Sequence, residues 1–196
     1  SGPLRSFRLL QEGRKKSRLL AAGNFDVRAD VRPGSLDTHI KGNLLEADLQ
    51  AFGFIDKHYI TSANTDITLR SDMKKYYAVS GNVGNLLLSE QRKGERLPLA
   101  EGNFNLDATM RGDQIEGSIN GVFPHVDLYQ LGIVDKAMTS SFSANTSFAM
   151  SGKDNLNVRG LIGNLRVTEK DRTYTPGDVN VDLMSRRDTV HAVLNG

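Results

Sequence analysis

The sequence predicts an all-β protein, an antiparallel meander of repeated units of about 79 residues with four strands each. Three observations support this prediction. Apolar and polar residues alternate with a period of two over much of the chain. The chain also resembles itself at one fixed offset, and it contains no long amphipathic helix pattern.

The repeat is plainest in two stretches that lie 79 residues apart, DLQAFGFIDK at 48–57 and DLYQLGIVDK at 127–136. At the same offset, AAGNFDVRADVR at 21–32 aligns with AEGNFNLDATMR at 100–111. About seventeen positions are identical at this offset, and self-similarity at a fixed period is the signature of repeat architectures.

A third copy begins near the end of the sequence, where 177–196 aligns with 102–121. We expect the tail of a preceding repeat at 1–20, one repeat at 21–99, a second at 100–176 and the start of a third at 177–196. The sequence then begins and ends inside repeats, so we expect it to be a piece of a longer array.

The first two strands of each unit are predicted by alternation. Phe25, Val27, Ala29 and Val31 alternate with polar residues, which gives the strand one apolar and one polar face. A turn at Pro33-Gly34 separates it from a second alternating run. Equivalent runs follow in the second copy, at 104–110 and 115–123, and in the third, at 179–183.

Two further strands complete the unit, one from Tyr59 to Leu69 and one from Tyr76 to Leu88. Glycines recur inside the strands, with Gly42, Gly81 and Gly84 matched by Gly121, Gly160 and Gly163. Glycine inside a strand weakens it, so recurrent glycines indicate bulges, bends or close backbone approach.

The repeated phrase itself predicts a one-turn helical plug after the second strand. Asp48 is placed to cap a helix N-terminus, and Gly53 allows a left-handed stop. Leu49 and Phe52 would lie on one side of the turn and pack against the edge of the sheet. Asp127, Leu128, Leu131 and Gly132 repeat this arrangement.

The basic segment LRSFRLLQEGRKKSRLL at 4–20 allows two interpretations. A helix on a membrane surface is one. However, Gly13 interrupts it, and the equivalent part of the next repeat resembles a strand, a loop and a strand. We therefore predict a hairpin with a basic tip.

Composition argues against several kinds of chemistry. The net charge is +2, which is too balanced to indicate nucleic-acid binding. The chain has no cysteine, and its four histidines lack the spacing of metal-ligand pairs. No nucleophile elbow, phosphate-binding loop or dinucleotide-binding motif is present. We expect no enzymatic activity, no catalytic residues, no metal and no cofactor.

An apolar sheet face must be buried against something: itself, a partner chain or an apolar ligand. The residues expected to line this face are Phe25, Val27, Val31, Leu36, Ile40, Leu44, Phe104, Leu106, Met110, Ile115, Ile119, Phe123, Val179, Val181 and Val190. Because a groove in a repeat protein lengthens with each copy, it suits long apolar ligands such as acyl chains.

The strand ending in DLYQLGIVDK, the alternating NFNLDATMRGDQIEGSING and the Asn-Gly turns resemble the AsmA-like superfamily, and within it the TamB family of translocation and assembly module subunits. The resemblance covers about residues 18 to 196. It implies a curved, taco-like sheet with an apolar concave face. It also implies a periplasmic segment of a protein anchored in the inner membrane of a Gram-negative cell, with an outer-membrane barrel as partner.

The resemblance therefore implies a non-enzymatic trough for phospholipid transport, outer-membrane protein assembly or both. Its clients would be phospholipid acyl chains or unfolded β-strands, and two copies of the chain would be able to dimerise over the exposed face. An alternative is a structural or adhesive module of tandem β-sandwiches with sealed cores. A carbohydrate-active β-solenoid is a further alternative, and the 79-residue period is too long for its rungs.

Overall fold

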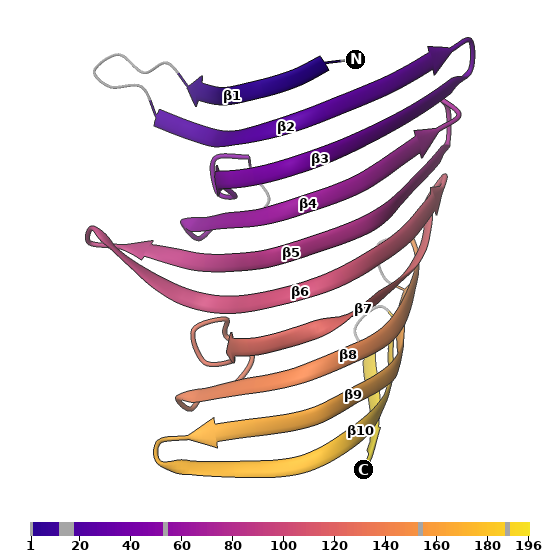
Figure 1. Cartoon of the computed structure of the whole chain (residues 1–196). Coiled ribbons are helices and arrows are strands. Elements are labelled where there is room, and N and C mark those ends of the chain that lie inside the picture. The colour runs from indigo at the N-terminus through magenta and orange to yellow at the C-terminus, as the bar shows by residue number, and fades with distance from the viewer. Residues whose placement is uncertain (1, 12–17, 53–54, 153–154, 187–188) are drawn as a thin grey trace.

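A computed structural model describes the chain except for residues 1, 12–17, 53–54, 153–154 and 187–188. The described residues form one open antiparallel sheet of eleven strands, ordered β1 to β11 as in the sequence (Figure 1). The strands are β1 Gly2–Gln11, β2 Arg18–Arg32, β3 Ser35–Asp48, β4 Tyr59–Ser71, β5 Tyr76–Arg92, β6 Glu95–Arg111, β7 Gln114–Asp127, β8 Met138–Ser151, β9 Asn155–Glu169, β10 Arg172–Arg186 and β11 Thr189–Asn195.

The all-β class and the antiparallel meander are confirmed, and the strands are longer than the alternation predicts. The strand expected from Tyr76 to Leu88 reaches Arg92. The hairpin expected within 4–20 is also confirmed, since β1 pairs antiparallel with β2 from Gly2–Val27 to Gln11–Arg18. Its basic tip at 12–17 lies outside the described residues.

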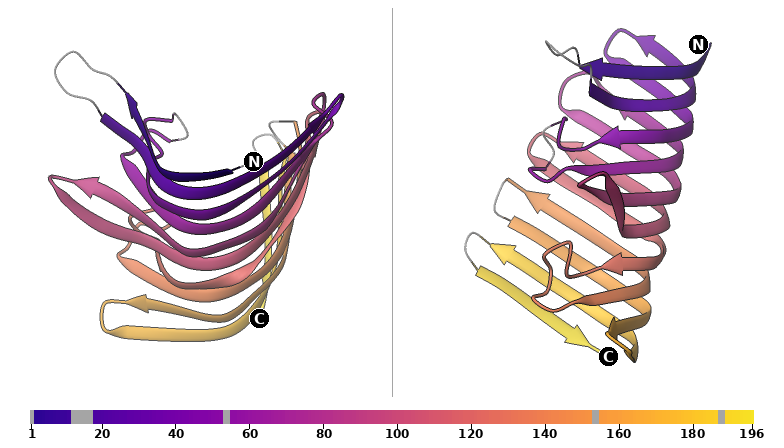
Figure 2. Two further views of the ribbon diagram at one scale, coloured as in Figure 1. Left: turned by 45° about the horizontal axis from the view of Figure 1, so that its top comes forward. Right: turned by 90° about the vertical axis from the view of Figure 1, so that its left-hand side faces the viewer.

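Each strand bends along its length, and the left view of Figure 2 shows the sheet as a U in cross-section. A β-bulge recurs three times, with two residues opposite one, and bulges bend and twist a strand. Its second residue has a left-handed φ at Ser6 (61°), Asn85 (49°) and Asn164 (53°). These three positions lie 79 residues apart.

The backbone N–H that each bulge frees finds a side-chain acceptor on the next strand. Ser6 donates to Asn24 Oδ1 at 2.7 Å, and Asn85 donates to Asn103 Oδ1 at 2.7 Å. Asn164 donates to Asp178 Oδ1 at 3.0 Å. Because an unpaired N–H is costly, an Asn or Asp opposite the bulge stabilises it.

Four of the recurrent strand glycines, Gly42, Gly81, Gly121 and Gly160, permit a close approach between backbones. A Cβ on Gly81 would lie 2.1 Å from the carbonyl oxygen of Asp66, and one on Gly160 would lie 2.2 Å from that of Asn145. No side chain fits there, because ordinary Cβ contacts are 3.4 Å or longer. Gly84 differs, since its Cβ would meet nothing closer than 3.6 Å, and it forms part of the bulge.

The register sorts the side chains into two faces. One row that crosses the sheet consists of Val27, Ile40, Ile67, Gly81, Leu106, Ile119, Thr146, Gly160, Val181 and Leu194. The adjacent row points the other way and consists of Asp26, Lys41, Asp66, Asn82, Asn105, Asn120, Asn145, Leu161, Asn180 and Asn195. We call the face of the first row the apolar face and the other the polar face.

The most deeply buried residues gather where β3 to β6 meet the loop between β3 and β4. Tyr59 and Ile60 begin β4 there, and Asp48 pairs with Ile60. Leu99 is fully buried at 0% exposure, and it is the extra residue where β6 bulges against β5. The described part of the chain therefore has a small core at one end of the strands and a broad, half-buried apolar face along the rest.

Candidate functional site

The fifteen residues predicted to line a groove all occupy register positions on the apolar face. Leu106 pairs with Ile119, and Phe104 lies two pairs further along, opposite Gly121. Val179 and Val181 continue the face on β10, and Val190 pairs with Ser185 at its far end. The register therefore places the predicted set on one face of the sheet, on β2, β3, β6, β7, β10 and β11.

This face is half-buried although no second layer of described residues covers it. Phe104, Leu106 and Ile119 are partly shielded, whereas Asn105 and Asn120 beside them are exposed. Val31 at 62% exposure and Leu194 at 65% are exceptions, because Val31 lies at the end of β2 next to a turn and Leu194 lies on the edge strand β11. Side chains on the inside of a bend converge and shield one another, so the contrast favours the apolar face as the concave one.

Aromatic rings lie along the apolar face near the middle of the strands. The ring centroids of Phe104 and Phe123 are 5.8 Å apart, and those of Phe123 and Phe142 are 5.1 Å apart. Gly102 leaves the space that Phe123 occupies, since a Cβ there would lie 2.7 Å from the ring. Ring pairs at these distances are favourable contacts, and they give the face a continuous hydrocarbon surface over three strands.

The loops after β3 and β7 form one rim of the sheet. Asp48 Oδ1 accepts a hydrogen bond from the Ala51 N–H at 3.0 Å, and Asp127 Oδ1 accepts one from the Gln130 N–H at 2.9 Å. The Asp127 carbonyl accepts from the Leu131 N–H at 3.1 Å, and Gly132 has a left-handed φ of 78°. The predicted capping by both aspartates and the stop at Gly132 are confirmed, and Gly53 lies outside the described residues.

The predicted helical plug is corrected in two respects. The described residues of both segments form turns and not helices, and each segment shows one i to i+4 hydrogen bond among them, from Phe52 to Asp48 and from Leu131 to Asp127. Phe52 is 40% exposed, so it is not packed away against the edge of the sheet as predicted. Its exposure follows from the shortness of the turn, which holds Leu49 closer to the sheet.

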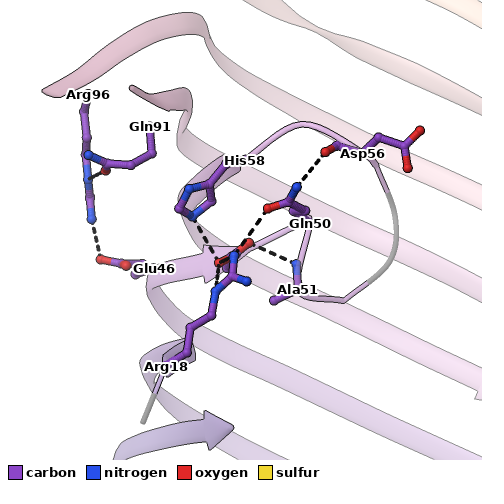
Figure 3. A network of polar contacts seen from close by, with 9 residues as sticks. Arg18, Glu46, Gln50, Ala51, Asp56, His58, Gln91 and Arg96 are labelled. Carbon is purple, nitrogen blue, oxygen red and sulfur yellow. Dashed lines mark hydrogen bonds and ion pairs between the residues drawn. The ribbon is translucent and has the colours of Figure 1, made fainter. Parts of the chain in front are cut away.

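Asp48 is the centre of a polar network at this rim (Figure 3). Its side chain is 4% exposed, and Arg18 Nε donates to its Oδ2 at 2.9 Å. His58 Nε2 lies 3.2 Å from the same oxygen. Burial alone would raise the pKa of Asp48, but the Ala51 N–H and the charges of Arg18 and His58 outweigh it and lower that pKa.

In the loop after β7, Asp127 caps the turn but is not the centre of a polar network like that of Asp48. The positions equivalent to Arg18 and His58 are Leu97 and Ala137, so Asp127 has neither partner. The two loops nevertheless touch, since Lys57 Nζ donates to the Gln130 carbonyl at 3.5 Å. Lys57, from the first acid–lysine pair of the repeated phrase, therefore connects neighbouring loops of the rim.

Several of these residues were not identified from the sequence. Arg18 lies 30 residues before Asp48, and no local pattern joins them. The residues that accept the bulge hydrogen bonds do show a pattern in the sequence. Asn24, Asn103 and Asp178 occupy equivalent positions when the similar stretches are aligned. The role of these residues as acceptors can be recognised only once the structure shows that Ser6, Asn85 and Asn164 lie in bulges.

Two further properties of the described residues bear on function. No three His, Asp or Glu side chains among them are grouped so as to hold a metal ion. No helix in the described part of the chain has the length and apolarity needed to cross a membrane.

Comparison with known proteins gave no relative, since no family model, no curated protein and no solved structure matches the chain.

Proposed function

We propose that the chain is a segment of an AsmA-like envelope protein of the TamB type, and that its sheet is a trough for apolar ligands. In this proposal the apolar face is the concave lining of a taco-like sheet built from units at 21–99, 100–176 and 177–196, after a tail at 1–20. The segment lies in the periplasm, its parent is anchored in the inner membrane, and an outer-membrane barrel is the partner.

One observation carries this proposal: an uncovered apolar face continues across every described strand of one sheet. With neighbouring strands about 4.8 Å apart, the ten intervals between β1 and β11 extend it over about 48 Å. Soluble proteins rarely expose apolar patches of more than a few hundred Å² unless the patch binds something.

Phospholipid acyl chains suit this face better than a compact ligand. The lining is hydrocarbon on adjacent strands, and the polar rows lie on the opposite face. Each CH₂ group that leaves water contributes about 0.8 kcal/mol, so even a half-covered acyl chain gains several kcal/mol. The surface holds and guides such a chain without chemistry, which is consistent with a non-enzymatic role.

Unfolded β-strands are the second client class in this proposal. β1 and β11 each pair with one neighbour only among the described strands, so both edges of the sheet present free backbone groups. An extended segment adds to such an edge through main-chain hydrogen bonds. The same free edges, or the apolar face itself, would allow two copies of the chain to associate.

The sealed tandem sandwich is less consistent with these observations. A sandwich needs two sheets packed face to face, whereas all described strands belong to one sheet. A solenoid is disfavoured as well, because every neighbouring pair of described strands is antiparallel.

A pair of charge substitutions tests the proposed lining. Leu106→Arg with Ile119→Arg places two charges next to each other on the apolar face, because the two residues pair. We expect binding of a fluorescent fatty acid to fall at least ten-fold, since a charge in an acyl-chain groove must be desolvated.

The matched control is Asn105→Arg with Asn120→Arg, the neighbouring pair on the polar face. This double variant should bind the probe as the parent does, and circular dichroism should show that both variants fold. Undiminished binding by folded Leu106→Arg/Ile119→Arg protein would exclude these residues from the lining.

A further inference from the structure

The two edge strands of the sheet, β1 and β11, differ in how well they are protected against pairing with a further strand. The pairing of β1 with β2 has two register shifts, and Ser6 within β1 has a left-handed φ of 61°. The sequence of β1 also contains a proline and two arginines. Bulges, proline and charge are features by which natural edge strands avoid additional partners, so the β1 edge is a protected one.

β11 has none of these features. Its sequence, TVHAVLN, contains no proline, no glycine and no Lys, Arg, Asp or Glu. All seven residues pair with β10 in unbroken register, whereas every other pairing of described strands contains a shift. Val193 and Leu194 on this strand are 53% and 65% exposed. A regular, uncharged edge strand of this composition favours the addition of another strand.

The occupant of such an edge is an extended backbone, because every second residue of β11 directs its N–H and C=O groups away from β10. A second copy of the chain supplies a strand of the same length with the same alternation. Like charges directly opposite each other destabilise a strand pair, and β11 carries no acid, lysine or arginine that would oppose its own counterpart. The composition of the strand is therefore compatible with self-pairing.

Strand direction limits how two copies can meet. Neighbouring strands are antiparallel throughout the described sheet, so β1 and β11 run in the same direction. In the same orientation, β11 of one copy would pair parallel with β1 of the next. Turning the second copy over makes that pair antiparallel, but it places the polar face of one copy beside the apolar face of the other. Neither arrangement continues the pattern of this sheet.

A two-fold axis perpendicular to the sheet avoids both problems. It makes the β11 strands of two copies antiparallel neighbours, and it keeps both apolar faces on the same side. Such a contact is isologous, the kind that closes a dimer. The same axis could join two β1 strands, but the irregular backbone and the arginines of β1 disfavour that contact.

We propose that two copies of the chain associate through antiparallel β11 strands about a two-fold axis at Ala192. In this register Ala192 lies opposite its own counterpart, and His191 lies opposite Val193. All seven residues of β11 are paired, and positions on the apolar face meet positions on the same face. Because the strand is short, the association is weak and depends on concentration. The inference rests on the two edge strands and not on the proposed trough.

Sedimentation velocity over a range of protein concentrations tests this proposal. We expect the parent protein to self-associate, and Ala192→Lys and Ala192→Glu, each alone, to weaken self-association at least ten-fold, because two like charges then lie opposite each other. An equimolar mixture of the two variants should associate again, because lysine then lies opposite glutamate. Only a position that lies close to its own counterpart across the axis gives this restoration.

Two control variants separate the β11 edge from the other surfaces of the sheet. Leu9→Lys adds a charge at a residue of β1 that is 45% exposed, and it should leave self-association unchanged. Leu106→Arg with Ile119→Arg should also leave self-association unchanged, because the proposed contact does not involve the middle of the apolar face. Circular dichroism should show that every variant is folded.

Four results would overturn the proposal. One is a parent protein that stays monomeric at the highest concentration. A monomeric parent that binds a peptide with the sequence of β8, which pairs with the equivalent strand β7, would give the edge to a segment of another chain. Undiminished association of Ala192→Lys would exclude the β11 edge. Loss of association in both charged variants without restoration in their mixture would exclude the two-fold axis at Ala192.

Discussion

Asp48 shows at the residue scale how one side chain fixes a whole loop. It caps the turn that follows β3, and it also joins that turn to the start of β2 through Arg18. The carboxylate is buried, so the charge is tolerated only because donors surround it. Asp127 caps its turn in the same way, but the position equivalent to Arg18 is Leu97. It therefore serves as a control within the same molecule.

Asp48→Asn should destabilise the protein by about 2–4 kcal/mol, because the amide still caps the turn but leaves the Arg18 charge without its buried anionic partner. Asp127→Asn should cost less than about 1 kcal/mol, because asparagine accepts the same capping hydrogen bond. Urea denaturation of both variants measures the difference. Equal losses would mean that the Arg18 contact adds nothing to the cap.

The effect of Asp48→Asn on the free energy of unfolding should depend on pH. The pKa of Asp48 is lower in the folded protein than in the unfolded chain, where it is about 3.9. Its contribution to stability is therefore complete above that unfolded pKa and is lost as the pH falls through the folded pKa. The difference in unfolding free energy between the parent and Asp48→Asn should be constant above about pH 5 and shrink below about pH 4.

Urea titrations at a series of pH values between 7 and 2.5 measure this difference. A gap that stays constant down to the lowest pH would contradict the lowered pKa of Asp48.

At the scale of the strand, two glycines of β5 differ in their surroundings. The backbone of β4 lies close to Gly81, whereas Gly84 has space for a side chain. Gly81→Ala should cost about 3 kcal/mol or more, because its Cβ would overlap the Asp66 carbonyl at 2.1 Å and the backbone must shift. Gly84→Ala, three residues away, should change stability by less than 1 kcal/mol, because no atom lies within 3.6 Å of its Cβ. Thermal unfolding checks both, and similar losses would contradict the overlap argument.

The alternation predicted the strands and their two faces because a period of two directly records which side chains share a face. It underestimated the ends of strands such as β5, because its last residues, 89–92, are all polar and show no apolar alternation. The turn after β3 was predicted as a helix because Leu49 and Phe52 have helical spacing, which a single turn satisfies equally well.

The polar contacts were the least predictable part of the site. Arg18 and Asp48 meet only because β2 and β3 are adjacent, and the sequence separates them by 30 residues. Such features require the register, which a single sequence does not contain.

At the scale of the whole molecule, the sheet resembles an extended repeat more than a globule. Each described strand pairs only with its neighbours in sequence, so there is no return of the chain to cover the apolar face. The bulges and close-approach glycines recur at the repeat spacing, and they occur in strands that bend. The function proposed here depends on that face being accessible to a ligand.

The most direct measurement places a photo-crosslinking amino acid at Phe104 or, separately, at its neighbour Asn105 on the polar face. Each folded, monomeric protein is irradiated with a cell-envelope lipid extract, and adducts are identified by mass spectrometry. We predict lipid adducts at position 104 and none at position 105. Absence of adducts at both positions, or equal adducts at both, would contradict a lipid-carrying apolar face.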